Sequence, residues 1–306
     1  MRDDELPESG NIEDRRGQGG FGGGFGGGGF PIGRGGGLGI GTIVVLGLIG
    51  WALGIDPRLL IGGAEMVSRQ QQPEIQRPAQ PGKVGAPSDE TGRFVSRILG
   101  STEVVWKAIF AADGKTYHPP GLVLFSGVTR AGCGLAQSAM GPFYCPSDKK
   151  IYLDTEFFQE IQTRFRGCEG KACRFSQAYV IAHEVGHHVQ DELGILTRAH
   201  SAQQAAGDRA DANRIQVRVE LQADCLAGVW AKKSNDRWDL LEPGDVEAAL
   251  RTAAAIGDDT LQRRAQGRVV PDSFTHGSAA QRQRWFNTGV TQGSVGACNT
   301  FAAQQL

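Results

Sequence analysis

The sequence predicts an α+β fold, mostly helical with a small β-sheet, for the region that begins near Arg93. Two observations lead to this class. Apolar residues recur at helical spacing along most of the region, whereas only two segments combine apolar runs with flanking turn residues, as strands do. Many helices beside few strands are typical of the α+β class.

The expected elements follow in order along the chain. The first is an amphipathic helix over residues 94–110, with a break at Gly100 as an open alternative. Two strand segments come next, at 121–128 and 141–154, the second interrupted by a turn. Helical spacing then predicts five further helices: 155–165, 176–193, 210–232, 243–257 and 278–288.

Composition separates this domain from the first third of the chain. Fifteen of the 45 glycines lie in residues 1–37, so we expect residues 1–34 to be a disordered glycine-rich tail. Residues 56–92 are rich in Gln, Pro and Gly and are typical of a flexible linker. The folded domain then covers residues 93–306, which suffices for one sizeable core.

The net charge of −1 leaves no broad basic surface, so nucleic acid is not an expected partner.

Residues 35–55 contain no charged side chain. At about 1.5 Å per residue a helix of this length reaches about 30 Å, the hydrocarbon thickness of a bilayer, which predicts one transmembrane helix. A cleaved signal peptide and a buried core helix are weaker alternatives, since a long tail precedes the segment and no A-x-A site follows it. A slight excess of arginine before the segment favours a cytoplasmic amino terminus and an external domain (Arg15, Arg16 and Arg34 before it, Arg58 and Arg69 after it).

Residues 183–187 have the sequence His-Glu-Val-Gly-His. On a helix, His183 and His187 lie on one face and can bind a single ion, while Glu184 lies beside an open coordination position. Zinc suits such ligands and lowers the pKa of a bound water to near 7, so Glu184 can act as general base. Independent placement predicts roughly 0.006 such matches in a chain of this composition, which disfavours a merely polar helix face.

A catalytic zinc needs a third protein ligand. The elongated H-E-x-x-H-x-x-G-x-x-H pattern is excluded, because Gln190 and Leu193 stand where it needs Gly and His. Further along, Glu220 and Asp224 lie one helical turn apart. We expect Glu220 to be the third ligand and Asp224 to accept the second ring N–H of a ligand histidine.

Two alternatives to this assignment remain open. In one, Asp224 is the ligand; in the other, both acids form an exposed helix face that pairs with Arg214 or Arg218. Small residues on the same helix would let it approach the histidine helix closely: Ala223, Ala227 and Gly228.

These motifs resemble the bacterial "putative neutral zinc metallopeptidase" family, membrane-anchored zincins with a glutamate third ligand. The resemblance rests on GPFYCPSDKKIYLD, AYVIAHEVGHHVQ, RVELQADCLAGVWA and SFTHGSAAQRQRWFNTG, and it extends over the glycine-rich region with its span and most of residues 93–302. It implies a zincin-like catalytic domain, with His183, His187 and Glu220 as zinc ligands and Glu184 as the base.

Three further features are weaker candidates. His276 precedes the last helix and could donate to the oxyanion of a reacting peptide, although a helix-cap or surface role fits slightly better. His188 points elsewhere on its helix than the ligand pair. Residues 141–154 could form an edge strand that pairs with an extended peptide, or simply a core hairpin.

Six cysteines allow 15 connectivities, and their spacing favours three disulfides in an oxidising compartment. Local pairing would join Cys168 to Cys173 and Cys133 to Cys145, which leaves Cys225 with Cys298. A four-cysteine zinc site is the competitor, but no C-x-x-C spacing occurs.

The sequence therefore predicts a zinc metalloendopeptidase with a peptide or protein substrate, held by one helix in the bacterial inner membrane with its catalytic domain on the periplasmic side. The alternatives are a metal-stabilised scaffold protein of the envelope and a zinc amidase acting on cell-wall peptides. Neither the substrate nor the oligomeric state follows from the sequence.

Overall fold

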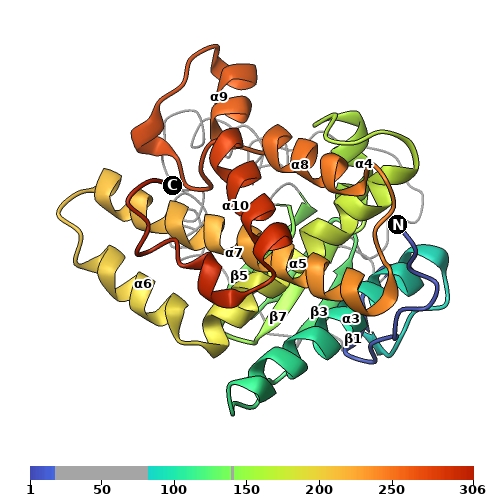
Figure 1. Cartoon of the computed structure of the whole chain (residues 1–306). Helices are drawn as coiled ribbons and strands as arrows, with labels where there is room; N and C mark the ends of the chain where they lie inside the picture. The colour runs from blue at the N-terminus through green and yellow to red at the C-terminus, as the bar shows by residue number, and fades with distance from the viewer. Residues whose placement is uncertain (18–81, 139–140) are drawn as a thin grey trace, which may run out of the picture. The chain divides into compact units, whose positions relative to one another are not determined.

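The computed structural model describes residues 1–17, 82–138 and 141–306 (Figure 1). The predicted transmembrane helix at 35–55, the later part of the predicted tail and most of the predicted linker lie outside these residues. Among the described residues, no helix combines the length and the apolar character that crossing a membrane requires.

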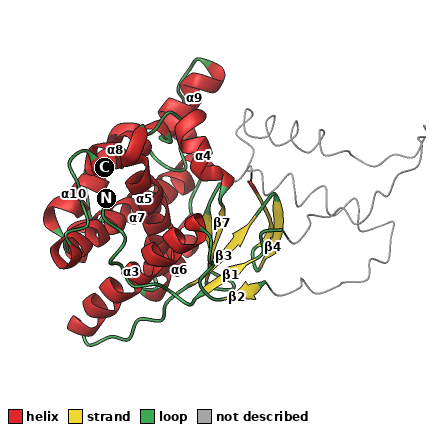
Figure 2. Ribbon diagram, turned by 90° about the vertical axis from the view of Figure 1, so that its right-hand side faces the viewer, coloured by secondary structure: helices red, strands yellow, loops and turns green. Residues whose placement is uncertain are grey.

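The domain is mostly helical with a small sheet, as the sequence predicts. Figure 2 shows the helices gathered on one side of the sheet. The helices, labelled as in Figure 1, are α3 (Glu90–Ala112), α4 (Glu156–Thr163), α5 (Cys173–Glu192), α6 (Ile195–Gln204), α7 (Arg209–Trp238), α8 (Asp245–Ala255), α9 (Asp258–Gln266) and α10 (Ala279–Gln292). The short helices α6 and α9 do not appear among the predicted elements.

The helix α3 differs from the prediction at two points. It begins at Glu90, inside the predicted linker, because the side chain of Asp89 accepts the backbone N–H of Gly92 and caps the first turn. It also continues without interruption through Gly100.

The main sheet has the strand order β2-β1-β3-β7-β6. Its strands are β1 (Ile12–Asp14), β2 (Lys83–Val84), β3 (Gly121–Phe125), β6 (Phe143–Cys145) and β7 (Lys150–Asp154). The three central strands run parallel, and β2 and β6 are antiparallel edge strands. A separate hairpin joins β4 (Val128–Ala131) to β5 (Gly134–Gln137).

Both faces of the central strands are covered, which explains why β3 is an unbroken apolar run. Leu122 and Leu124 point into the large core beneath the helices. Val123 and Phe125 point to the opposite face, where a smaller apolar cluster includes Ala136 of the β4–β5 hairpin. The sheet is thus the middle layer of the domain.

Residues 1–17 belong to this fold, so the prediction that the whole of residues 1–34 is disordered is wrong for its first half. Ile12 is fully buried in the core, and β1 pairs in register with β3. The glycine-rich composition that predicted disorder is concentrated after residue 17, whereas the earlier residues carry apolar and charged side chains that contact the domain.

The helices pack most closely where small residues meet. A Cβ added at Gly186 of α5 would lie 2.9 Å from the carbonyl oxygen of Ala223 on α7, so glycine is needed for this crossing. Ala223 therefore has the role that the sequence predicts. Gly228 instead faces α10, where an added Cβ would lie 2.3 Å from the oxygen of Phe286.

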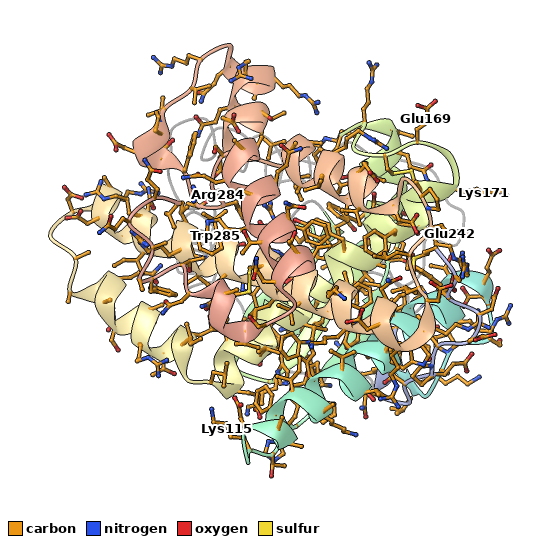
Figure 3. The ribbon with its side chains drawn as sticks, in the orientation of Figure 1. Lys115, Glu169, Lys171, Glu242, Arg284 and Trp285 are labelled. Carbon is orange, nitrogen blue, oxygen red and sulfur yellow. A yellow bond between two sulfur atoms is a disulfide. The ribbon has the colours of Figure 1, made fainter. Side chains whose placement is uncertain are left out.

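Charged side chains lie on the periphery of the helical layer. Lys115, Glu169 and Lys171 project outward (Figure 3), whereas Trp285 of α10 is only 7% exposed.

The substitution Gly186→Ala should lower the free energy of unfolding by about 1–3 kcal/mol, because the new methyl group forces α5 away from α7. Urea unfolding in the presence of a chelator measures this without any contribution from metal. The matched control is Gly296→Ala, since a Cβ at Gly296 meets nothing within 4 Å. Equal unfolding midpoints for the two variants would contradict the packing argument.

Candidate metal centre

Two histidines and one glutamate from two crossing helices form the candidate metal centre. His183 and His187 stand one turn apart on α5, with ring centroids 4.8 Å apart. Glu220 comes from α7, which crosses α5 at Gly186 and Ala223. All three side chains present a ligand atom to a common point, the ligand atoms lying within 4.8 Å of one another.

The distances within this group fit a tetrahedral zinc site. Oε2 of Glu220 lies 3.3 Å from Nε2 of His183 and 3.5 Å from Nε2 of His187. With zinc–ligand bonds of about 2.0–2.1 Å, neighbouring ligand atoms of a tetrahedron are about 3.3–3.4 Å apart. The residues present therefore fit a zinc ion, with a fourth position left for a non-protein ligand.

Glu184 has the surroundings expected of a proton acceptor. Its side chain is only 7% exposed, yet it has no hydrogen bond or ion pair with any residue that the structure describes. It follows His183 directly on α5, and its charge is among the causes that raise the pKa of His187.

Asp224 holds His183 in place from behind. Its Oδ1 accepts a hydrogen bond from Nδ1 of His183 at 2.8 Å, which directs Nε2 toward the metal position. The same carboxylate accepts from the hydroxyl of Tyr179 at 2.6 Å and from two nitrogens of Arg282, each at 2.9 Å. With both of its oxygens occupied in this way, Asp224 is poorly placed to serve as the metal ligand itself.

Gln190 holds the second histidine. Nδ1 of His187 donates to Oε1 of Gln190 at 2.9 Å, and the Gln190 amide donates in turn to Val219 O and to Oε1 of Gln222. In the sequence, Gln190 serves only to exclude a longer zinc motif. Its place three residues after His187, on the same helix face, is the signal that could have revealed this role.

The acids and histidines of the group shift one another's pKa values when no metal is bound. Burial disfavours the imidazolium of His183, but the Asp224 carboxylate outweighs it and raises the pKa of His183 to about 10. Burial likewise opposes ionisation of Glu220, but the neighbouring His187 and His183 hold the pKa of Glu220 well below its usual value. A metal ion that binds here must therefore displace protons from the ligand rings, so its binding releases protons.

Comparison with known proteins agrees with this centre: the chain matches the family described as "Putative neutral zinc metallopeptidase" over residues 1–301. It belongs to that family. It is 47% identical over 305 residues to the uncharacterized protein YpfJ of Escherichia coli (strain K12), covering 98% of this chain and 99% of YpfJ. It is 42% identical over 273 residues to the uncharacterized protein Rv2575 of Mycobacterium tuberculosis (strain ATCC 25618 / H37Rv), covering 83% and 85% of the two chains. No solved structure matches the chain.

In this member of the metallopeptidase family, His276 lies in the loop before α10, where Asp258 of α9 holds it. Oδ2 of Asp258 accepts the backbone N–H groups of Thr275, His276 and Gly277 at 2.7, 2.6 and 3.1 Å. Its Oδ1 lies 3.3 Å from Nδ1 of the His276 ring. The loop packs on α7, since a Cβ at Gly277 would meet the side chain of Leu221, next to Glu220, at 3.1 Å.

The His276 side chain is half exposed, and its Nε2 is not engaged by any described residue. The partial burial of the ring opposes the charged form, but the hydrogen bond with Asp258 and the charge of Glu220 raise the pKa of His276 above its usual value. The protonated form of His276 is thus favoured by two carboxylates, one of which is the candidate ligand Glu220. The sequence gives no indication of Asp258, which lies 18 residues away.

His188 has a structural role on the other side of α5. It is fully buried, its Nε2 donates to the carbonyl oxygen of His118 at 2.6 Å, and its Nδ1 lies 3.1 Å from the hydroxyl of Tyr144. Tyr144 belongs to β6, an edge strand of the main sheet, so His188 joins the metal-centre helix to that edge.

The three disulfides have the predicted pairing: Cys133–Cys145, Cys168–Cys173 and Cys225–Cys298. Cys225 follows Asp224 directly on α7, so the Cys225–Cys298 disulfide ties that helix to the segment after α10.

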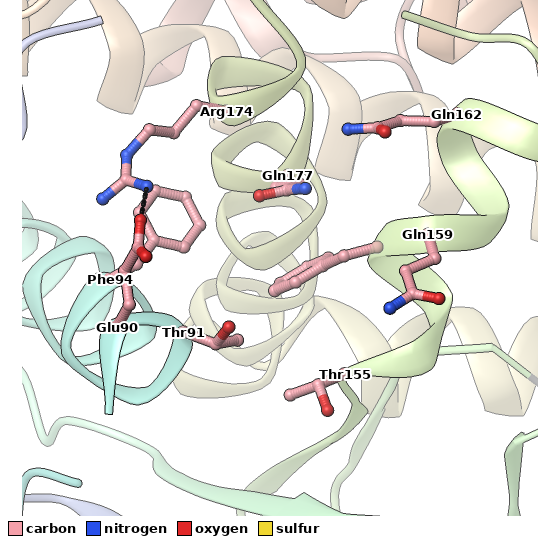
Figure 4. A pocket seen from close by; sticks show the side chains of 9 residues that line it. Glu90, Thr91, Phe94, Thr155, Gln159, Gln162, Arg174 and Gln177 are labelled. Atoms are coloured by element: carbon pink, nitrogen blue, oxygen red, sulfur yellow. Dashed lines mark ion pairs between the residues drawn. The ribbon is translucent and has the colours of Figure 1, made fainter. Parts of the chain in front are cut away.

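A surface cavity of about 180 Å³ (Figure 4) is lined by residues of α3, α4 and α5, and none of the three candidate metal ligands lines it.

Removal of a metal ligand or of its support should weaken zinc binding to different degrees. Glu220→Ala should abolish stoichiometric zinc binding, whereas Gln190→Met, which frees the His187 ring, should weaken it about 10–100-fold. Competition with a fluorescent chelator measures both affinities. Glu247→Gln, an exposed change on α8, is the control and should bind about one zinc per chain. Unchanged affinity in Glu220→Ala would contradict the assignment.

Proposed function

We propose that this protein is a zinc-dependent metalloendopeptidase whose ligands are His183, His187 and Glu220 and whose general base is Glu184. The observation that carries the proposal is the spacing of the two Nε2 atoms from Oε2 of Glu220, at 3.3 and 3.5 Å, beside an unpaired buried carboxylate. Two imidazoles and one carboxylate with an open fourth position are the ligand set of a catalytic rather than a structural zinc.

A zinc ion held by these ligands would acidify a water molecule and polarise the carbonyl group of a peptide. Glu184 would accept a proton as the water oxygen bonds to the carbonyl carbon, and would deliver it to the amine as the C–N bond breaks; its carboxylate has no competing hydrogen-bond partner among the described residues. Asp224 and Gln190 keep the two ring nitrogens directed at the centre, because each accepts the N–H on the far side of a ligand ring.

His276 supplies the donor that such a reaction needs besides the metal. Its Nδ1 is held by Asp258, so the opposite nitrogen of the ring is left to donate to the carbonyl oxygen as negative charge develops there. The raised pKa of His276 favours the doubly protonated ring that makes the strongest donor.

The three disulfides support the further proposal that the catalytic domain works in an oxidising compartment outside the cytoplasm. Anchoring in the inner membrane through residues 35–55 stays a prediction from the sequence.

Glu184→Gln should abolish peptide cleavage while retaining about one zinc per chain, because the substitution removes the proton acceptor and leaves all three ligands. The measurement is digestion of a diverse peptide library by the full-length protein, with Glu247→Gln as the control. The full chain is needed, because residues 1–17 are part of the fold.

Other results of this assay would favour other functions. Cleavage at the wild-type rate by Glu184→Gln would refute the mechanism. A zinc-loaded wild-type protein that cleaves nothing would favour the scaffold alternative, and digestion of muropeptides instead of proteins would favour the amidase.

Asp258→Asn should lower kcat with little change in KM and move the alkaline limb of the pH–rate profile to lower pH. The carboxylates of Asp258 and Glu220 raise the pKa of His276 and the charge of Arg282 lowers it, so loss of one carboxylate makes the ring deprotonate at lower pH. Activity that needs the protonated ring is then lost at a lower pH in the variant than in the wild type.

Asp259→Asn is the matched control, since its carboxylate accepts the backbone N–H of Ala279 at 2.7 Å and makes no hydrogen bond with His276. If both variants show the wild-type pH profile, His276 does not act as the proposed donor. An equal loss of activity at every pH in Asp258→Asn alone would indicate that Asp258 only shapes the loop.

A further inference from the structure

The amino-terminal segment, residues 1–17, supplies an interior strand of the main sheet. Strand β1 lies between β2 and β3, with Ile12 opposite Leu122 and Asp14 opposite Leu124. Backbone hydrogen bonds flank this pairing, from Leu122 N to the oxygen of Asn11 and from Arg15 N to the oxygen of Leu124, both at 2.8 Å. Without the segment, β3 would be left with an unpaired edge next to the core.

An ion pair with a buried carboxylate and several hydrogen bonds attach the earlier part of the segment to the helices. Asp3 is 4% exposed and accepts from Nε and Nη2 of Arg174 on α5, at 2.6 and 2.9 Å. Figure 4 shows the side chain of Arg174 reaching from α5 toward Glu90 of α3, with which it forms an ion pair. On α3, Glu103 accepts hydrogen bonds from Ser9 and Asn11 at 2.6 and 2.8 Å.

The helix α3 is itself shaped to receive the segment. A Cβ added at Gly100 would lie 2.2 Å from the carbonyl oxygen of Pro7, so only glycine allows the segment to cross the helix there. One turn earlier, Oγ of Ser96 donates to the carbonyl oxygen of Ser9 at 2.9 Å. A glycine within a helix costs roughly 1 kcal/mol relative to alanine, and this crossing gives a physical reason for it.

The arginines that favour a cytoplasmic amino terminus are used by the same fold. Arg15 pairs with Glu13 at 2.8 Å and donates to the oxygen of Arg130, and Arg16 pairs with both Asp14 and Asp89. Their side chains are only 11% and 19% exposed. Neutralised and partly buried, they no longer supply the charge excess on which the predicted orientation depends.

We propose that residues 1–17 lie on the same side of the membrane as the metallopeptidase domain, which is the oxidising side. The chain leaves the sheet after β1 and returns to it at β2, and these two strands pair with each other. One crossing of a bilayer between them would place the paired strands in different compartments. The predicted single-pass arrangement with a cytoplasmic amino terminus is therefore incompatible with the sheet, whatever the domain catalyses.

Thiol labelling of the full-length protein in intact spheroplasts tests this placement. Asp4→Cys reports on the segment, since the Asp4 side chain is 91% exposed, and Lys115→Cys reports on the domain. A membrane-impermeant maleimide should label both variants equally before permeabilisation. Labelling of Lys115→Cys alone before permeabilisation would overturn the proposal, and protection of both would overturn the assignment to the oxidising side.

A disulfide across β1 and β2 provides a second, independent test. Asp14 and Lys83 are direct partners in the antiparallel pair, which is a spacing that a disulfide can bridge. A protease site introduced between residues 63 and 80 allows the chain to be cut into an amino-terminal fragment and a domain fragment. In the double variant Asp14→Cys, Lys83→Cys, a disulfide should keep these two fragments linked after cleavage until reductant is added. Asp14→Cys with Lys115→Cys is the unpaired control. Fragments that separate without reductant, in cells whose thiols were blocked before lysis, would contradict the proposal.

Discussion

The buried carboxylate of Asp224 is the contact on which the site depends. It is fully buried on α7 and binds His183 and Tyr179 of α5 together with Arg282 of α10, which is only 3% exposed. Three helices therefore meet on one charge. Removal of one partner of such a buried pair costs about 3–5 kcal/mol, because the other charge remains without compensation. The constraint that aligns a candidate metal ligand is thus the same one that fixes how α5, α7 and α10 pack.

A second chain of contacts ties the other candidate histidine ligand to the end of the domain. His187 is held by Gln190, Gln190 by Gln222, and the amide of Gln222 donates to the carbonyl oxygen of Cys298 at 2.9 Å. Cys298 in turn forms the disulfide with Cys225 on α7. The residues that orient the two histidine rings are therefore themselves fixed by hydrogen bonds. The rings are ordered before a metal binds, which limits the loss of side-chain entropy on binding.

The site could be predicted from the sequence where its spacing is local. His183 and His187 lie four residues apart, as do Glu220 and Asp224, so helical periodicity alone places each pair on one face. The partners that complete the site are distant in the sequence: Arg282 lies 58 residues from Asp224, and Asp258 lies 18 residues from His276. No periodicity connects them, and an arginine in a polar helix is usually interpreted as a solvent-exposed residue.

The fold shows the same limit more sharply in its first strand. The helices of the domain follow from apolar spacing, but β1 has only three residues, and its partner β3 begins more than a hundred residues later. A composition averaged over residues 1–37 is dominated by the glycines after residue 17, which conceals the two acids and two arginines that follow one another in residues 13–16. The domain did carry a local sign of this segment, a glycine in the middle of α3. In a helix that continues without a break, Gly100 is better explained by another chain crossing at that point than by a helix end, and that chain is the amino-terminal segment.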